Sequence, residues 1–168
     1  MSAILASLVL IGALSAPGER AVTAGGKPWT ILPVGESESA LMQCSRTSPG
    51  PSAPFWSPAS AQVEELEKRL PAYLRQQKHA AHADKLASYL RQYAGFTRKG
   101  RKLIYLNAFP TNVVDMLCHE DVKASQGDCR NHWRIEGIFV CDGGDDFWGV
   151  EYDPESKTFS GLDFNGSA

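Results

Sequence analysis

The sequence predicts an α+β domain in which one or two N-terminal helices pack on a four- to five-stranded antiparallel sheet. Apolar residues recur at helical spacing between residues 59 and 93, and the period of the pattern changes to two after Gly95. Helices first and strands later are typical of an α+β architecture. The composition indicates one globular domain, because 43% of the 168 residues are hydrophobic and 21% are charged.

The chain begins with an uncharged apolar run from Ala3 to Ala16. This run is shorter than the roughly 20 residues that a membrane helix needs, and it resembles the apolar core of a signal peptide. A basic n-region is missing, so a buried N-terminal helix or strand is the alternative. Small residues favour cleavage after Ser15 or after Ala24. We expect residues 1–24 to be a signal peptide and the mature chain to be periplasmic or secreted, without a membrane anchor.

Residues 25–58 should be irregular. Seven of the ten prolines lie between Pro17 and Pro58, together with many Gly and Ser residues. This segment is either a linker or an extended stretch that packs on the domain. Residues 59–168 should then form a single α+β domain.

The first clear helix should begin near Ser57, which is a plausible N-cap, with Pro58 at the first helical position. One face of this helix carries its apolar residues, which are Val63, Leu66, Leu70, Tyr73 and Leu74. Pro71 should kink the helix or end its first half. A second helical segment is expected over roughly 84–93, with Gly95 as its stop.

After Gly95 the pattern predicts a hairpin, with its turn over Arg98–Gly100 and its second strand over Lys102–Phe109. Residues 110–133 should be irregular except for one helical turn near 113–117. Three further strands are expected at close spacing, over Ile135–Cys141, Phe147–Tyr152 and Thr158–Phe164. In the last two strands, alternate apolar side chains should meet on one face.

The chain has four cysteines, Cys44, Cys118, Cys129 and Cys141. An even number in a small exported protein favours two disulfides, for which three pairings are possible. The first to consider joins Cys118 to Cys129, which are eleven positions apart across a polar stretch, and leaves Cys44 with Cys141. The alternative joins Cys129 to Cys141 and Cys44 to Cys118.

The same cysteines with His119 and His132 could also form a zinc cluster, but only Cys129 and His132 have the close spacing of zinc ligands. His79 and His82 have the spacing of a surface metal pair, which is more often chance. The acidic loop after Cys141 matches no calcium-loop pattern. The sequence contains no nucleophile elbow, phosphate loop or H-E-x-x-H motif. We therefore expect no metal or cofactor.

Charge is segregated along the chain, although the net charge is only −2. Residues 64–102 hold ten Lys/Arg and four Asp/Glu, and residues 142–168 hold one Lys and seven Asp/Glu. Either the two halves lie side by side, or one of them steers a charged partner. The densest clusters are two predicted turns, with Arg98, Lys99, Arg101 and Lys102 in one and Asp142, Asp145 and Asp146 in the other. The near-neutral total argues against a nucleic-acid partner.

Two stretches, YLRQYAGFTRKGRKLIYLNAF (Tyr89 to Phe109) and VCDGGDDFWGVEYDPESKTFSGLDFNG (Val140 to Gly166), resemble a group of small exported proteobacterial proteins without an assigned activity. The resemblance implies an exported single-domain protein and brings no catalytic residue. The expected architecture also resembles, loosely, the helix-on-sheet folds of cystatins and periplasmic enzyme inhibitors. That analogy concerns fold and does not give function.

These observations predict an exported, non-enzymatic protein-binding module, such as an inhibitor or immunity protein against a cell-envelope enzyme. Its contact surface is expected at the Arg98–Lys102 turn or at the Asp142–Asp146 turn. Two alternatives are a small exported hydrolase that uses Asp/Glu residues, His119 or His132, and a structural envelope protein.

Overall fold

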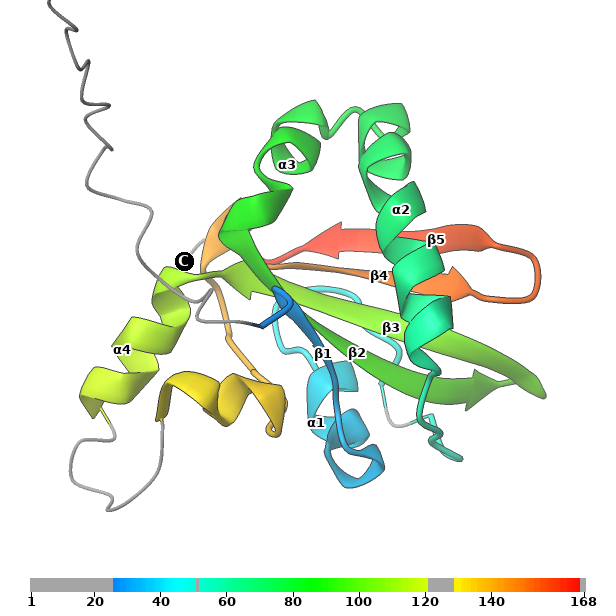
Figure 1. Cartoon of the computed structure of the whole chain (residues 1–168), viewed down its shortest axis with the longest axis horizontal. Coiled ribbons are helices and arrows are strands. Elements are labelled where there is room, and N and C mark those ends of the chain that lie inside the picture. Colours follow the sequence, from blue (N-terminus) through cyan, green and yellow to red (C-terminus); the bar gives the residue numbers. More distant parts are fainter. Residues whose placement is uncertain (1–25, 51, 121–128, 167–168) are drawn as a thin grey trace, which may run out of the picture.

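A five-stranded sheet forms the centre of the computed structural model, which describes residues 26–50, 52–120 and 129–166 (Figure 1). The strands lie in chain order: β1 Trp29–Ile31, β2 Tyr89–Arg98, β3 Arg101–Pro110, β4 Trp148–Asp153 and β5 Thr158–Phe164. The short edge strand β1 runs parallel to β2, and all other neighbours are antiparallel. The α+β class is confirmed, and the sheet is mixed rather than purely antiparallel. The predicted signal peptide lies outside the described residues.

Helices cover both faces of the sheet, whereas the sequence predicted helices on one face. On the first face, α2 (Ser60–Gln76) and α3 (Ala80–Asp84) bury Leu66, Leu70 and Ala83 against alternate side chains of β2, β3 and β4. On the second face lie α1 (Ser37–Leu41), α4 (Asn112–Glu120) and the 3-10 helix η4 (Cys129–Arg134). Within the described ranges, no helix has both the length and the apolar character to cross a membrane.

Helix α2 begins at Ser60, three residues after the predicted cap. Its N-cap is Ala59, whose backbone N–H donates to the Gln62 side chain (2.9 Å). Pro71 lies inside the helix and does not end it. Leu70 and Leu74 are both buried against the sheet, so packing holds the helix on each side of the proline and outweighs the lost hydrogen bond.

The predicted helix over 84–93 is wrong. The chain forms a 3-10 turn, η2 (Leu86–Ser88), and enters β2 at Tyr89. Every residue from Tyr89 to Phe96 is buried, because this central strand is covered on both faces. An alternation of apolar and polar residues is therefore absent there, and the apolar run fits a helix as well as a strand.

The segment 25–58 is more regular than predicted, since it contains β1, the 3-10 helix η1 (Val34–Glu36) and α1. Conversely, no strand forms over Ile135–Cys141. The Ile138 N–H donates to the Gln92 side chain (2.8 Å), and the Ile138 carbonyl accepts from Asn107 (2.8 Å). Side chains of the sheet thus satisfy backbone groups that a neighbouring strand would otherwise pair.

A buried polar network on the second face holds these irregular segments to the sheet. Arg46 donates to the Tyr105 hydroxyl (3.1 Å) and to the side-chain carbonyls of Asn107 (2.5 Å) and Asn165 (2.6 Å). Asn107 in turn donates to Gln92 (3.0 Å). Gln92 also donates to the carbonyls of Trp133 and Glu136, both at 2.6 Å. Four segments distant in sequence are therefore joined by one set of hydrogen bonds.

Replacing Gln92 with Leu tests this network. The substitution Gln92→Leu should lower the free energy of unfolding by about 2–3 kcal/mol, because it leaves buried backbone groups near Ile138 without partners. Urea denaturation measures the change, and hydrogen exchange should accelerate at residues 133–138. The exposed Gln76→Leu change on α2 is the control, with an effect within about 0.5 kcal/mol. Equal effects of the two substitutions would contradict this role for Gln92.

The five tyrosines give a second prediction. Burial raises the pKa of every one, and it does so most clearly for Tyr93 in β2, whose hydroxyl donates to Glu67. For Tyr89, burial and the nearby Asp146 carboxylate raise the pKa to about 12. The folded state therefore keeps neutral phenols above the ordinary pKa of 10.0, at which the unfolded chain ionises.

Stability should consequently be retained up to about pH 10 and be lost as the pH rises toward 12. In an absorbance titration, tyrosinate should appear together with unfolding, as followed by circular dichroism. The same titration in concentrated urea should show ordinary ionisation near pH 10. Ionisation of most tyrosines near pH 10 in a protein that stays folded would argue against this prediction.

Candidate functional site

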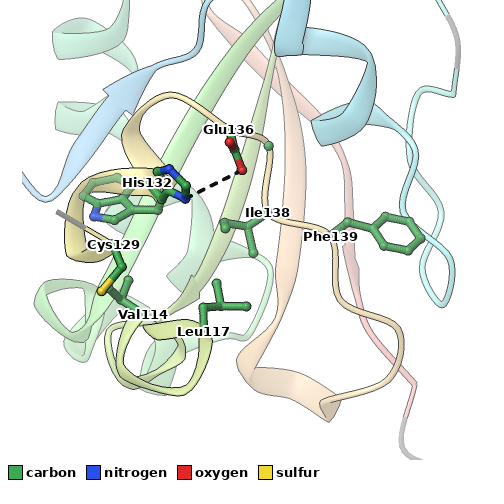
Figure 2. Close-up of a pocket in the computed structure, with 9 residues that line it drawn as sticks. Val114, Leu117, Cys129, His132, Glu136, Ile138 and Phe139 are labelled. Atoms are coloured by element: carbon green, nitrogen blue, oxygen red, sulfur yellow. Dashed lines mark ion pairs between the residues drawn. The ribbon is translucent and has the colours of Figure 1, made fainter. Parts of the chain in front are cut away.

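A cavity of about 240 Å³ opens between α4, η4 and the segment 136–139 on the second face (Figure 2). Most of its lining residues are apolar, and the side chains of His132 and Glu136 add polar surface. The lining residues are Val114, Leu117, Cys129, His132, Trp133, Glu136, Gly137, Ile138 and Phe139. A concave apolar site with a few polar groups is the usual form of a binding pocket.

Packing and a disulfide fix the walls of this cavity. In α4, Val113 and Val114 are buried against Leu90 and Phe109 of the sheet. Trp133 of η4 is also buried, and its ring meets the Phe109 ring edge to face, with centroids 6.3 Å apart. The disulfide Cys118–Cys129 joins α4 to the first residue of η4. Gln92 and Asn107 hold the third wall through the backbone of Ile138.

His132 and Glu136 form the polar part of the cavity. Their Nδ1 and Oε2 atoms are 4.0 Å apart, and Figure 2 shows the two side chains facing each other. The side chains are 54% and 58% exposed, so water screens their interaction. The sequence analysis named His132 as a candidate base, but it did not connect it with Glu136. The spacing of four residues was the available signal.

Exposed large hydrophobic residues gather on the same side of the molecule. Within the described ranges there are five, Val34, Met42, Met116, Ile135 and Phe139. All five belong to the segments that cover or border the second face of the sheet. Around the cavity, Phe139 lines the wall, Met116 lies in α4, and Ile135 directly follows η4. The outward side of α2, on the first face, carries charged residues such as Glu64, Arg69 and Arg75. Exposed apolar side chains that gather in this way often mark an interaction site.

The basic turn between β2 and β3 is largely neutralised within the chain. The Arg98 guanidinium donates to both carboxylate oxygens of Glu151 (2.7 and 2.8 Å), and Arg101 pairs with Asp153. The Lys102 ammonium lies 5.3 Å from the centre of the Trp56 ring. Of the four residues predicted to contact a partner, only Lys99 forms neither an ion pair nor a contact with an aromatic ring in the described structure. The basic and acidic halves of the sequence therefore meet side by side at this turn.

The acidic turn lies at the opposite end of the sheet, because Trp148, next to this turn, pairs with Ala108 at the far end of β3. It contains the 3-10 helix η5 (Gly144–Asp146), and the backbone of Asp142 has a φ of 65°. Asp142, Asp145 and Asp146 are exposed. The two predicted contact turns thus cannot form one surface.

Asp146 accepts a hydrogen bond from the Tyr89 hydroxyl (3.1 Å), and the Asp145 carbonyl is 2.9 Å from His82 Nε2. The His82 ring also lies 4.9 Å from the ring of Phe164 and 6.5 Å from that of Trp148. The interpretation of His79 and His82 as an isolated surface pair missed this aromatic cluster. Its effect is to dock the acidic turn against α3.

The structure pairs Cys118 with Cys129 and Cys44 with Cys141, the pairing that the sequence analysis considered first. All four cysteines are thereby oxidised, so none is a thiolate that could bind zinc or act as a nucleophile. The side chain of His119 lies outside the described residues. Two disulfides fit an extracellular or periplasmic location.

Comparisons with protein-family models, with curated proteins and with solved structures find no match. No function is therefore transferred from a related protein. The cavity and its apolar surroundings are the features from which function has to be inferred.

The disulfides should contribute unequally to stability. In the chain-entropy description, the bond across 97 residues stabilises by about 5 kcal/mol and the bond across 11 residues by about 3 kcal/mol. Urea denaturation of the paired variants Cys44→Ala/Cys141→Ala and Cys118→Ala/Cys129→Ala measures both losses. A larger loss for the short loop would contradict the expected order. Only the second variant should also alter ligand access to the cavity.

Proposed function

We propose that the protein is an exported protein-binding module that accommodates an apolar side chain of its partner in the cavity beside α4. One observation carries this proposal: Met116, Ile135 and Phe139 are exposed in or next to the segments that surround an open cavity with mostly apolar lining residues. Exposed hydrophobic residues around a pocket are typical of the centre of a protein interface.

The magnitude of apolar burial agrees with a protein partner. Fully burying one large hydrophobic side chain is worth about 1.5–3 kcal/mol. Met116, Ile135 and Phe139 are 60%, 54% and 52% exposed, so covering each of them gains roughly half of that value, which offsets part of the cost of association. The walls are also preorganised by a disulfide and by the buried polar network. A rigid site loses little conformational entropy on binding, which favours a protein that acts by occupying another.

An inhibitor or immunity protein against a cell-envelope enzyme is the role that we propose for such a module. The two disulfides support a location outside the cytoplasm, and the apolar run at residues 3–16 supports export. The basic turn is a less suitable contact surface than the sequence suggested, because Arg98 and Arg101 already have acidic partners.

Hydrolysis is a second candidate, favoured by His132 and Glu136 at the cavity. A carboxylate can orient a histidine that acts as a general base. The two side chains are, however, more than half exposed and 4.0 Å apart. This geometry provides little of the desolvation and orientation that raise catalytic efficiency, so the binding function is preferred.

Capture from a cell-envelope extract of the native host tests the binding function. The intact, oxidised protein is immobilised, and captured proteins are quantified by mass spectrometry. Ile135→Asp and Phe139→Asp should each reduce recovery of the partner at least about tenfold, because a charge would have to be desolvated in the interface. Ala61→Asp, an exposed change in the first turn of α2, is the matched control and should leave recovery unchanged.

His132→Ala separates the two candidate functions. It should retain partner capture if the protein acts by binding, since the partner's contacts are mainly apolar. Loss of a hydrolytic activity in this variant, with no partner whose recovery depends on Ile135 or Phe139, would favour the enzyme. A partner recovered equally by wild type, Ile135→Asp and Phe139→Asp would refute the cavity as the binding site.

A further inference from the structure

We propose that the first face of the molecule has a separate binding site, a groove between α2 and β5 that takes an extended acidic segment of a partner protein. The groove has a volume of about 560 Å³. It is formed by the later turns of α2 and by the beginning of β5, and Figure 1 shows α2 crossing the sheet toward this edge. It lies on the opposite face from the cavity beside α4 and does not depend on the function proposed for that cavity.

The floor of the groove is apolar and aromatic. Tyr73 of α2 and Phe159 of β5 stack with ring centroids 4.6 Å apart and an angle of 21° between the ring planes. Ala72 continues this apolar surface along the helix. Tyr73 and Phe159 are only partly buried, so a ligand side chain can reach them.

The rim of the groove is basic. It contains Lys68 and Arg69 from α2 and Lys157 from the turn before β5, together with the amides of Gln76 and Gln77. Arg69 is paired with Glu65 (2.6 Å). Neither Lys68 nor Lys157 lies within ion-pair distance of a described carboxylate, although Glu65, which is paired with Arg69, is near enough to feel both charges. The rim therefore keeps a net positive charge that acidic side chains can approach. This charge contrasts with the basic turn at Arg98 and Arg101, whose arginines are compensated within the chain.

The edge of the sheet favours a polypeptide as the occupant. Strand β5 is the last strand, and no described strand pairs with its outer side. Its first residues, Thr158 to Ser160, pair regularly with β4, and the register shifts only beyond them. Farther along β5, Asp163 accepts a hydrogen bond from the Thr47 N–H (2.8 Å). The part of the edge beside the groove is thus open, and an extended peptide can hydrogen-bond to such an edge while its side chains enter neighbouring pockets.

The apolar floor and the basic rim lie on the same side of the edge strand. In an extended peptide, successive side chains point to opposite sides, so residues two positions apart face the same side. An apolar residue can therefore lie on the Tyr73–Phe159 pair while acidic residues two positions before and after it reach Lys68 and Lys157. An extended segment in which apolar and acidic residues take turns at every second position is the chemistry that the groove fits.

Fluorescence anisotropy tests this site with a fluorescein-labelled peptide in which Glu, Leu and Glu occupy every second position and Thr occupies the positions between them. The full oxidised protein should bind the peptide, and the variant Lys68→Glu/Lys157→Glu should bind it at least about tenfold more weakly. The control is Lys85→Glu/Lys99→Glu, which makes the same charge change outside the groove. It is matched in backbone as well, because Lys157 and Lys99 both lie in turns with positive φ, 57° and 51°. The control should retain at least half of the wild-type affinity.

Two altered peptides separate strand addition from simple charge attraction. A peptide with Lys in place of Glu should not bind. A peptide that keeps every Glu but has Pro at the central position should bind at least about tenfold more weakly, because Pro lacks the N–H that pairs with the edge. Hydrogen exchange of the Thr158–Ser160 amides should slow only with the original peptide.

The proposal is overturned if the Glu–Leu peptide does not bind or if both double variants lose affinity equally. It is also overturned if the Pro peptide binds as well as the original without protection of β5, because the association would then be electrostatic only. Lys68→Glu alone serves as a second variant if the double change alters the circular dichroism spectrum. The Phe139→Asp variant should bind the peptide normally, which keeps this test independent of the α4 cavity.

Discussion

The buried guanidinium of Arg46 constrains the second face of the sheet. A buried cation is costly unless its donors are satisfied, and all three acceptors here are neutral groups, the Tyr105 hydroxyl and the side-chain carbonyls of Asn107 and Asn165. These acceptors have to be held in place by further hydrogen bonds, which reach Gln92 and the backbone of residues 133–142. The irregular wall of the cavity is therefore a consequence of satisfying one charge.

The two faces of the sheet consequently differ in both interior and surface. The first face buries apolar side chains under α2 together with one ion pair between Arg91 and Glu67, and other charged residues lie on the outer side of the helix. The second face combines apolar clusters with the polar network, and its covering segments are short. Short segments cannot cover their own apolar residues fully, which explains why Met116, Ile135 and Phe139 remain exposed there.

The sequence was a good guide where one side of an element faces water. Helix α2 and strand β5 each show the expected period, and their apolar positions were identified correctly. It was a poor guide for β2, which is buried on both faces, and for Ile135–Cys141, whose backbone is paired by side chains from distant segments. The cavity combines residues from position 114 to position 139, so no local sequence pattern predicted it. Ile135 and Phe139 were instead assigned to a strand over Ile135–Cys141 that does not form, and Met116 was assigned to a single helical turn.

The hydrogen bond between Arg46 and Asn165 joins positions that are 119 residues apart. An N-terminal portion of the chain therefore has no means of completing the second face as it emerges during synthesis. The central hairpin of β2 and β3 is local and can form early. Arg46 cannot form its hydrogen bond to Asn165 until β5 and the residue after it have been synthesised. Folding should then be slow to finish and should depend on the last strand. Such a chain remains incompletely folded for long enough to be moved across a membrane in an extended state.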